Sequence, residues 1–358
     1  MHVASSKYMK ICTKLSDYTY DLPKELIAQQ PAENREDARL LILHRSTGKI
    51  EHRIFHEITE YLYPGDLLVL NDTKVIPALV TGHRISGAFL ELLLTEEMGE
   101  NQWKALIKSN ARLKKGEVIY LGNTTISAKL INKAEDGSWL IKFDKNYDIK
   151  DILTQIGKMP LPPYIKRNNN KGSFSSFDQE RYQTVFAQKE GAIAAPTAGL
   201  HFSQNTLEEI KKHGVDIGFV TLHTGMGTFL PIKTDDIQKH HMHKEYYECP
   251  GEIIQKIEKT KEHKNRVIAV GSTSCRVLES VAMNNQIPQI SGWTNLFIYP
   301  PYNFKYVDVL LTNFHLPKTT LLVLVCAFAG RENILNAYEI AKNKGYRFFS
   351  YGDCMMII

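Results

Sequence analysis

Residues 64–77, PGDLLVLNDTKVIP, lead from the N-terminal part of the chain into a stretch that is rich in predicted β-strands. From about Asp66 to Asp144 the chain predicts short strands almost throughout, separated by Gly, Asn and charged turns, and Asp136-Gly137 is a strong hairpin signal. Regularly spaced short strands of this kind indicate a small barrel or sandwich. The expected strands are Asp66–Leu70, Val75–Arg84, Phe89–Thr95, Trp103–Lys108, Glu117–Leu121, Ile126–Asn132 and Trp139–Phe143.

The rest of the chain alternates between strands and helices, which favours an α/β layer architecture. We therefore expect an α/β main domain with an inserted small all-β barrel-like domain. The predicted limits are 1–74 and 148–358 for the discontinuous main domain and 75–147 for the inserted one. The expected elements after Arg181 are the strands Ala192–Ala195, Val215–Leu222, Arg266–Val270, Trp293–Tyr299, Val307–Thr312 and Tyr346–Tyr351, and the helices Glu252–His263, Val277–Met283, Thr320–Phe328 and Asn333–Lys344.

The composition is that of an ordinary globular protein, with 43% hydrophobic and 23% charged residues among 358. A formal net charge of +5 is compatible with a polyanionic partner without requiring one. The five cysteines are scattered without a CxxC pair, which predicts reduced thiols in a cytoplasmic protein. Residues 1–14 lack the apolar segment of a secretory signal, and either Met1 or Met9 fits as the start. The most apolar run, Leu321–Ala329, is too short to cross a bilayer, so no membrane association is expected.

Four segments rich in Gly, Thr, Ser or His follow predicted strands. The carboxyl ends of strands are where α/β sheets bind ligands, and small residues there let a ligand approach the backbone. A tight turn with a packing histidine is the alternative for each segment. Two successive strands that both end in Thr, Gly and His favour a ligand site, because His can transfer protons near neutral pH. The four segments are Ala195–Phe202, Thr221–Phe229, Gly271–Arg276 and Thr312–Pro317.

The third segment, Gly271–Arg276, is predicted to be a loop that precedes a helix. Hydroxyl groups and free backbone N–H groups at a helix N-terminus favour an anion or developing negative charge. The spacing differs from GxxxxGK[ST] and from GxSxG, which argues against a nucleoside triphosphate site and against a nucleophile-elbow hydrolase. A plain capping loop is the alternative.

Other polar segments leave two interpretations open. Asn71–Lys74, at the mouth of the β-rich stretch, is either a plain turn or a polar part of the cleft. The histidines in His240–Glu245 suggest metal ligation, but no carboxylate or Cys stands at a characteristic spacing, so a basic loop facing solvent or RNA is favoured and no metal is expected. Basic and aromatic residues alternate in a way that suits looped RNA, although each patch alone is also typical of ordinary surface. These patches are Lys104–Lys115, Tyr164–Arg167 and His240–Tyr247.

Taken in order, these segments closely resemble the S-adenosylmethionine:tRNA ribosyltransferase-isomerase family of the queuosine pathway, from about Tyr20 to the last residues. The matching runs are Leu40–Leu43, Pro64–Pro77, Leu161–Ile165, Tyr182–Ala187, Gly191–Phe202, Thr221–Phe229, Met242–Glu245, Arg266–Ser280, Thr312–Pro317, Ala327–Gly330 and Tyr346–Asp353. The departures from the family's pattern are mostly small or apolar exchanges, at Thr224, Met226, Cys275, Val277 and Pro301.

The resemblance implies a reaction that composition alone does not show. Such enzymes transfer and isomerise the ribosyl unit of S-adenosylmethionine onto 7-aminomethyl-7-deazaguanine, at the wobble position of tRNA with a GUN anticodon. The product is epoxyqueuosine, and adenine and methionine are released. The resemblance also implies an α/β domain with an inserted β-barrel, no metal and no cofactor, since S-adenosylmethionine is a co-substrate. We expect a cytoplasmic monomer.

The implied chemistry sets roles for the site residues. The sulfonium acidifies the adjacent ribose carbon, so a base can remove a proton there, and expulsion of adenine needs a proton donor. We expect Thr197, Thr228 and Ser272 to orient the ribose, and Arg276 to hold the methionine carboxylate through two hydrogen bonds. The catalytic candidates, without assignment among them, are His201, His223 and His315. The substrate-binding candidates are Asn71, Asp72, Thr197, Gly199, Thr221, Gly225, Gly227, Thr228, His243, Glu245, Ser272, Thr273, Arg276 and Asn313.

Two rival functions remain at this stage. One is a catalytically silent RNA-binding protein. The other is a conventional methyltransferase, which normally carries a Gly-rich first strand-to-helix turn with an acidic residue ~20 positions later. The sequence shows no such turn.

Overall fold

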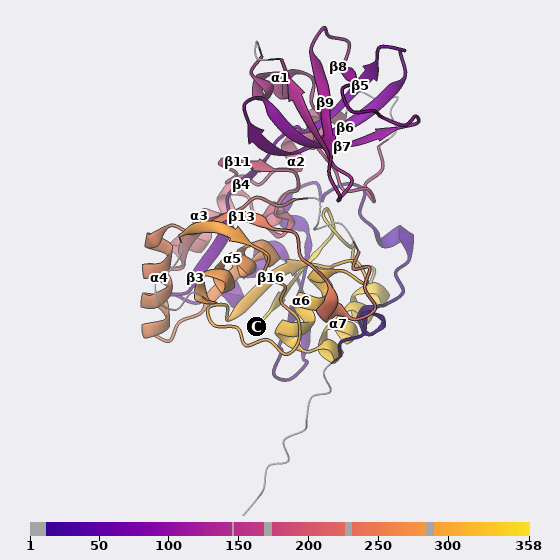
Figure 1. The fold of residues 1–358 in the computed structure, drawn as a ribbon. Helices are drawn as coiled ribbons and strands as arrows, with labels where there is room; N and C mark the ends of the chain where they lie inside the picture. The colour runs from indigo at the N-terminus through magenta and orange to yellow at the C-terminus, as the bar shows by residue number, and fades with distance from the viewer. Residues whose placement is uncertain (1–11, 145–146, 168–173, 226–230, 284–289) are drawn as a thin grey trace, which may run out of the picture.

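A nine-stranded mixed sheet forms the centre of the larger part of the molecule, in the order β15-β13-β12-β3-β14-β16-β17-β1-β2 (Figure 1). The computed structural model describes residues 12–144, 147–167, 174–225, 231–283 and 290–358. Strands β12, β3, β14 and β16 run parallel, so their carboxyl ends meet at one edge of the sheet. The strands are β1 Arg39–Leu43, β2 Ile50–Ile54, β3 Leu67–Asn71, β12 Asp216–Leu222, β13 Glu245–Glu248, β14 Val267–Val270, β15 Ser291–Thr294, β16 Val309–Asn313 and β17 Cys354–Ile357.

Both faces of this sheet are covered, which explains why β3, β14 and β16 are apolar except at their carboxyl ends. In β3, Leu67 and Val69 pack into the hydrophobic cluster beneath α4, α5, α6 and α7, whereas Leu68 and Leu70 pack against α3 and the short helices η4 and η5. These helices are α3 Gln204–Lys212, α4 Gly251–Glu262, α5 Gly271–Met283, α6 Thr320–Ala329, α7 Arg331–Asn343, η4 Phe55–Tyr61 and η5 Thr197–His201.

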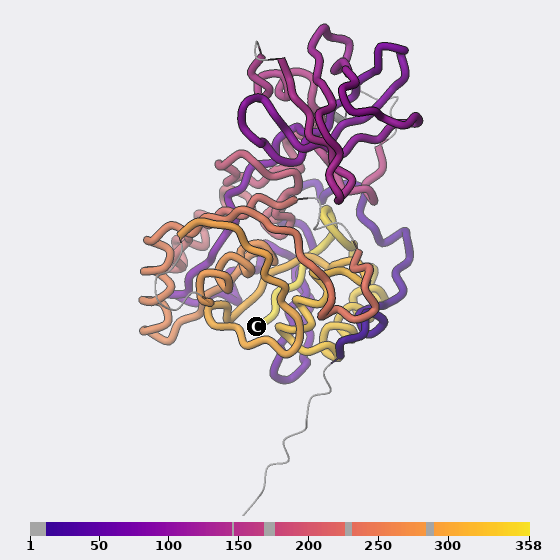
Figure 2. Tube along the Cα trace, viewed as in Figure 1, coloured from indigo at the N-terminus to yellow at the C-terminus, as the bar shows by residue number. Residues whose placement is uncertain are grey.

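A closed antiparallel barrel stands on one end of the α/β body, in the order β10-β7-β6-β5-β8-β9 (Figures 1 and 2). Its inward side chains form a separate core that includes Leu92, Trp103 and Ile141. The barrel strands are β5 Leu79–Arg84, β6 Phe89–Gly99, β7 Gln102–Ser109, β8 Val118–Leu121, β9 Ser127–Lys133 and β10 Trp139–Phe143. The predicted fold class, an α/β domain with an inserted all-β barrel, is confirmed; the exact limits 75–147 stay a prediction.

A small two-stranded sheet lies between the barrel and the α/β body, where β4 Thr73–Val75 pairs in parallel with β11 Lys189–Ala192 (Figure 1). The remaining elements are η1 Leu15–Tyr18, η2 Lys24–Leu26, η3 Arg35–Asp37, α1 Ile149–Ile156, α2 Phe174–Arg181 and η7 Ile237–Lys239. Among the described residues no single helix is long and apolar enough to span a membrane. Helices α6 and α7 reach that length and apolar composition only when they are taken together, and they are bent by 113° to each other.

Several predicted strands are shorter or placed differently. The first predicted strand of the β-rich stretch, Asp66–Leu70, belongs to the main sheet as β3. The predicted strand Val75–Arg84 is two strands, because Pro77 between them has no N–H for a sheet hydrogen bond. The predicted strands Ala192–Ala195 and Trp293–Tyr299 lie earlier in the chain, as β11 and β15.

Two further predictions near the site were wrong. The predicted loop Gly271–Arg276 is the first part of α5, so its N–H groups belong to the first turn of a helix that directly follows β14. The predicted strand Tyr346–Tyr351 is irregular, since Phe349 adopts a left-handed conformation with φ of 71° that a strand does not allow. The last strand is β17 instead.

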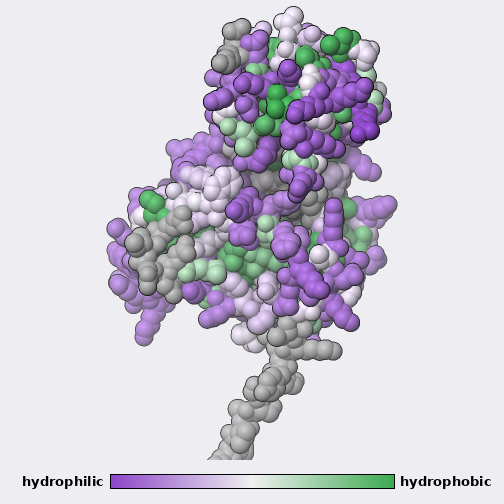
Figure 3. All heavy atoms as spheres, in the orientation of Figure 1, coloured by the Kyte–Doolittle hydropathy of each residue, from purple (hydrophilic) through white to green (hydrophobic). Residues whose placement is uncertain are grey.

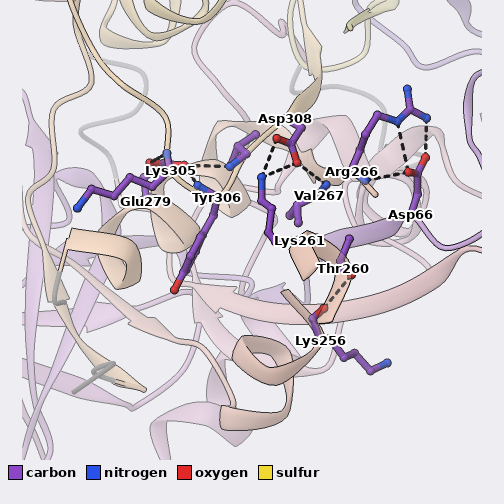
Figure 4. Close-up of polar contacts among 11 residues, drawn as sticks. Asp66, Lys256, Thr260, Lys261, Arg266, Val267, Glu279, Lys305, Tyr306 and Asp308 are labelled. Carbon is purple, nitrogen blue, oxygen red and sulfur yellow. Dashed lines mark hydrogen bonds and ion pairs between the residues drawn. The ribbon is translucent and has the colours of Figure 1, made fainter. Parts of the chain in front are cut away.

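Charged residues hold the edge of the sheet opposite to the carboxyl ends of β3 and β14 (Figure 4). Asp66 pairs with Arg266, and Asp308 pairs with Lys261 while accepting the backbone N–H of Val267 at 2.8 Å. These bonds join the starts of β3, β14 and β16, so the charged side chains at this edge stabilise the sheet. The edge at the carboxyl ends of the same strands is the one where a ligand site is expected.

Glu279 on α5 is fully buried and accepts the backbone N–H groups of Lys305, Tyr306 and Val307 at 2.9–3.1 Å. We expect Glu279→Ala to lower the free energy of unfolding by roughly 3 kcal/mol or more, because each buried donor left without a partner costs ~1–3 kcal/mol. Glu279→Gln, which keeps one carbonyl acceptor, is expected to lose less. Urea unfolding measures both, with the exposed Glu262→Ala on α4 as control; equal stability of all three variants would contradict the role given to Glu279.

Candidate active site

Asn71, Asp72 and Thr73 follow one another where β3 ends and the chain leaves the main sheet toward the barrel. The buried Asn71 side chain accepts the N–H groups of Thr73 and Leu222 at 3.1 Å and donates to the carbonyl of Leu222 at 3.1 Å. Asp72 accepts the Thr221 hydroxyl at 2.6 Å, and burial raises the pKa of this carboxyl group. Asn71, Asp72 and Thr221, which were predicted to bind substrate, thus join β3 to β12 through these bonds.

A pocket of about 60 Å³ lies where β14 and β16 end, and we call it the hydroxyl pocket. Thr224 and Thr273 are 3% and 9% exposed, and their hydroxyl groups have no hydrogen-bond partner in the described part of the chain. Buried hydroxyl groups are normally bonded, so these two are available to a ligand. The polar residues lining the hydroxyl pocket include Thr197, Thr224, Ser272, Thr273, Thr312, Asn313, His315 and Ser350.

His201 lies behind the hydroxyl pocket. Asn313 accepts the Thr197 hydroxyl at 3.0 Å, and its amide nitrogen lies 3.2 Å from His201 Nε2 and 3.2 Å from the carbonyl of Phe349. The amide therefore donates to both, and His201 Nε2 accepts. Burial, with the charges of two nearby arginines, lowers the pKa of His201 to about 3. This uncharged histidine positions Asn313.

His315 lines the hydroxyl pocket itself. Its Nε2 lies 2.7 Å from the hydroxyl oxygen of Thr312, and burial lowers its pKa to about 3. At neutral pH its ring is therefore uncharged, which limits it to hydrogen bonding as a neutral imidazole.

A larger hollow of about 710 Å³ separates the barrel from the α/β body, and we call it the interdomain cleft. The barrel contributes Glu96, Lys104 and Asp136 to its lining. Thr224 lines both the interdomain cleft and the hydroxyl pocket, so the two hollows adjoin. The small β4–β11 sheet contributes Glu190 and Gly191, and the α/β body contributes His223, Thr224, Gly225, His243, Lys244, Glu245, Tyr246 and Trp293.

His223 is the one of the three predicted catalytic histidines that faces the interdomain cleft. Its Nδ1 lies 2.8 Å from the Thr73 hydroxyl, and its ring stacks on Tyr246 with centroids 6.0 Å apart. A Cβ at Gly191 would lie 2.9 Å from Nε2 and Cε1 of His223, so only glycine fits against this ring. Burial lowers the pKa of His223, and Lys189 adds to this effect while Glu248 opposes it.

An apolar hollow of about 170 Å³ contains one charged pair. Arg276 and Glu245, each 6% exposed at its side chain, form an ion pair, and Arg276 Nε donates to the carbonyl of Leu296 at 3.1 Å. Nη2 of Arg276 has no partner among the described residues. The predicted bidentate contact from Arg276 would therefore require the displacement of Glu245, whereas Nη2 can make a single bond. The apolar lining includes Met242, Leu296, Phe297, Ile298, Leu321 and Leu324.

The structure brings most predicted binding residues to these three hollows. Gly225 donates its N–H to Glu245 at 3.0 Å, and His243 lines both the apolar hollow and the interdomain cleft. Gly199 serves packing, because a Cβ there would lie 2.8 Å from the Phe186 ring. The predicted residues Gly227 and Thr228 lie outside the described residues.

Sequence reasoning missed Trp293 as part of the site, and it named Thr73 and Tyr246 only as members of the segments Asn71–Lys74 and His240–Tyr247. Tyr246 and the exposed Trp293 meet edge to face, with centroids 5.7 Å apart, and continue the stack from His223 along the interdomain cleft. Trp293 and Tyr246 face each other across the β13–β15 pairing. An aromatic residue in a strand is ordinarily a core residue, so the signal at Trp293 pointed to packing.

Comparison with known proteins shows to which proteins this chain is similar. Residues 15–357 match a family described as queuosine biosynthesis protein. Relatives named S-adenosylmethionine:tRNA ribosyltransferase-isomerase occur in Thermotoga maritima and Carboxydothermus hydrogenoformans, with 48% and 49% identity over 96% of this chain and 100% of each relative. A crystal structure of S-adenosylmethionine tRNA ribosyltransferase from Thermotoga maritima is similar over 96% of this chain and 100% of its own, with 40% identity and a TM-score of 0.55.

Because the Thr273 hydroxyl has no partner in the described part of the chain, we can predict how its removal changes the free energy of unfolding in the absence of ligand. Thr273→Val is expected to leave the free energy of unfolding unchanged or higher, since it removes a buried hydroxyl that makes no bond. Thr312→Val, which removes the partner of His315, is expected to lower it by ~1 kcal/mol or more. Denaturant unfolding of both valine variants is the measurement. Equal destabilisation would mean that the Thr273 hydroxyl has a partner within the protein.

Proposed function

The chain belongs to the S-adenosylmethionine:tRNA ribosyltransferase-isomerase family of queuosine biosynthesis, and from that premise we propose that it moves the ribosyl unit of S-adenosylmethionine onto 7-aminomethyl-7-deazaguanine at the wobble position of a tRNA with a GUN anticodon. The products are epoxyqueuosine in the tRNA, adenine and methionine. The enzyme acts as a monomer in the cytoplasm, where its tRNA substrate is, and uses neither a metal nor a cofactor. The observation that carries the proposal is the hydroxyl pocket, whose unpartnered threonines adjoin a cleft large enough for a base.

The hydroxyl pocket suits a ribose. Thr224 and Thr273 supply free hydroxyl groups, and Ser272 and Thr273 lie in the first turn of α5, where N–H groups have no partner within the helix. Sugar hydroxyl groups both donate and accept, so threonine hydroxyls and helix N–H groups complement them. Thr197 and Asn313 are already bonded to each other and complete the wall.

The Arg276–Glu245 pair suits the amino acid end of S-adenosylmethionine. A methionine moiety carries one ammonium group and one carboxylate, the reverse of the charges on Glu245 and Arg276. The carboxylate can accept the free Nη2–H of Arg276, while the ammonium group lies against Glu245. The apolar lining of the same hollow, including Met242 and Leu296, fits the methylene groups between the charges and the sulfonium.

His223 is the candidate base. With Nδ1–H donated to the hydroxyl oxygen of Thr73, Nε2 carries the lone pair that a proton acceptor needs. Its lowered pKa keeps the ring neutral at physiological pH, so it is ready to accept a proton. His201 and His315 have pKa values of about 3 and serve to position neighbouring polar groups.

One assay tests the reaction and separates it from its rivals. We expect the protein, S-adenosylmethionine and tRNA carrying 7-aminomethyl-7-deazaguanine to yield adenine and methionine, detected by chromatography and mass spectrometry. A matched tRNA with guanine at the wobble position is the control and should release neither product. S-adenosylhomocysteine in place of adenine would identify a methyltransferase, and tight tRNA binding without any small product would identify a silent RNA-binding protein.

The proposed base makes a prediction about pH. His223→Ala is expected to lower kcat by ~100- to 10,000-fold, the usual contribution of one positioned acid or base. In the wild-type enzyme, kcat should fall as the pH drops through a pKa below 6.5, because the base works only when it is unprotonated. The exposed His56→Ala is the matched control and should behave as wild type. Unchanged turnover in a folded His223→Ala variant would exclude this histidine from the mechanism.

A further inference from the structure

A separate hollow of about 730 Å³ lies on the barrel, and we call it the barrel groove. Four cationic side chains line it, and all four are exposed: Arg112, Lys114, Lys115 and Lys133. The described residues that line it include no Asp or Glu. Hydrophilic residues cover much of the barrel face visible in Figure 3. The barrel groove therefore combines a concave shape with charge of one sign.

The charges of the barrel groove have no carboxylate partner within the described part of the chain, unlike other lysines near the barrel. Lys104 pairs with Glu96 at 2.5 Å, and Lys150 pairs with Glu97 at 3.2 Å. The carboxylate nearest in sequence to Lys114 and Lys115 is Glu117, which is held by Arg84 at 2.5 Å and by the backbone N–H of Lys114. Glu135 stands two residues after Lys133, and neither forms an ion pair within the described part of the chain. The positive charge of the groove is therefore available to an outside anion.

The barrel groove and the interdomain cleft lie on opposite faces of the same part of the barrel wall, because neighbouring residues of a strand point to opposite faces. Along β7, Lys104 and Leu106 line the interdomain cleft, whereas Ile107 and Ser109 line the barrel groove. In the turn before β10 the two hollows alternate in the same way, with Asp136 and Ser138 on the cleft side and Gly137 and Trp139 on the groove side. An extended chain that leaves the interdomain cleft would therefore pass around this end of the barrel wall to reach the barrel groove.

We propose that the barrel groove binds the sugar-phosphate backbone of the tRNA beyond the nucleotide held in the interdomain cleft, where the RNA passes around the barrel. This inference rests on the proposed function. Phosphates repeat along a polynucleotide, and lysine and arginine neutralise them without reading the base sequence. The barrel would then supply most of the affinity for tRNA, while the α/β body supplies the chemistry.

The test removes three charges from the groove. Arg112→Ala/Lys114→Ala/Lys115→Ala is expected to raise the KM for tRNA by about tenfold or more and to leave the KM for S-adenosylmethionine and kcat within about twofold. The slope of log Kd for tRNA against log salt should become shallower by ~2, since each phosphate contact with single-stranded RNA contributes ~0.7. Steady-state kinetics and fluorescence anisotropy at several salt concentrations measure these quantities.

Two controls keep the test decisive. Lys211→Ala/Lys212→Ala/Lys259→Ala removes the same charge from exposed positions on α3 and α4 and should change neither the KM nor the salt slope. The charge-preserving pair Lys114→Arg/Lys115→Arg should bind tRNA as wild type. An unchanged KM and slope in the groove variant, or an equal loss in the α3/α4 control, would overturn the proposal. If the wild-type enzyme released no adenine, the proposed function would fail, whereas the anisotropy comparison would still decide whether the barrel groove binds tRNA.

Discussion

The buried side-chain amide of Asn71 is the constraint on which the rest of the site depends. Its three hydrogen bonds hold the end of β3 against the end of β12 and orient the next residues toward the barrel. Thr73, two positions later, is thereby placed against Nδ1 of His223. A primary amide can both donate and accept, and burial makes each unmade bond costly, so no apolar residue could replace this connection. The orientation of the His223 ring depends on it through Thr73.

The two edges of the sheet are built from different chemistry. The edge near Asp66 and Asp308 is held by ion pairs, whereas the opposite edge carries hydroxyl groups and histidines with lowered pKa values. Burial favours the neutral imidazole. Uncharged histidines do not repel a sulfonium cation, so a positively charged co-substrate fits this edge better than it would fit a site with imidazolium ions. Burial thus sets the charge state of these histidines.

Much of the fold could be predicted from the sequence because it follows local rules. Turn residues separate the barrel strands, and the apolar run of α6 is long enough for a buried helix but too short for a bilayer. The predictions that failed depended on contacts between distant segments. Phe349 leaves the extended region where residues 346–351 pack into the core, and the start of α5 at Gly271 depends on how β14 ends in the sheet. Neither contact can be read from the few residues on either side of Phe349 or Gly271, because the partners lie far away in the chain.

The sequence by itself determined which segments meet, because Thr, Gly, Ser and His at the ends of parallel strands must gather at one edge of the sheet. It also determined the family, through motifs spread over nearly the whole chain. Only the tertiary structure decided where each side chain lies and which groups it bonds. His201, His223 and His315 look alike in sequence, yet one lies behind Asn313, one faces the interdomain cleft and one bonds Thr312. The physical reason is that burial and hydrogen-bond partners, which set the pKa and the reach of a side chain, arise from segments far apart in the chain.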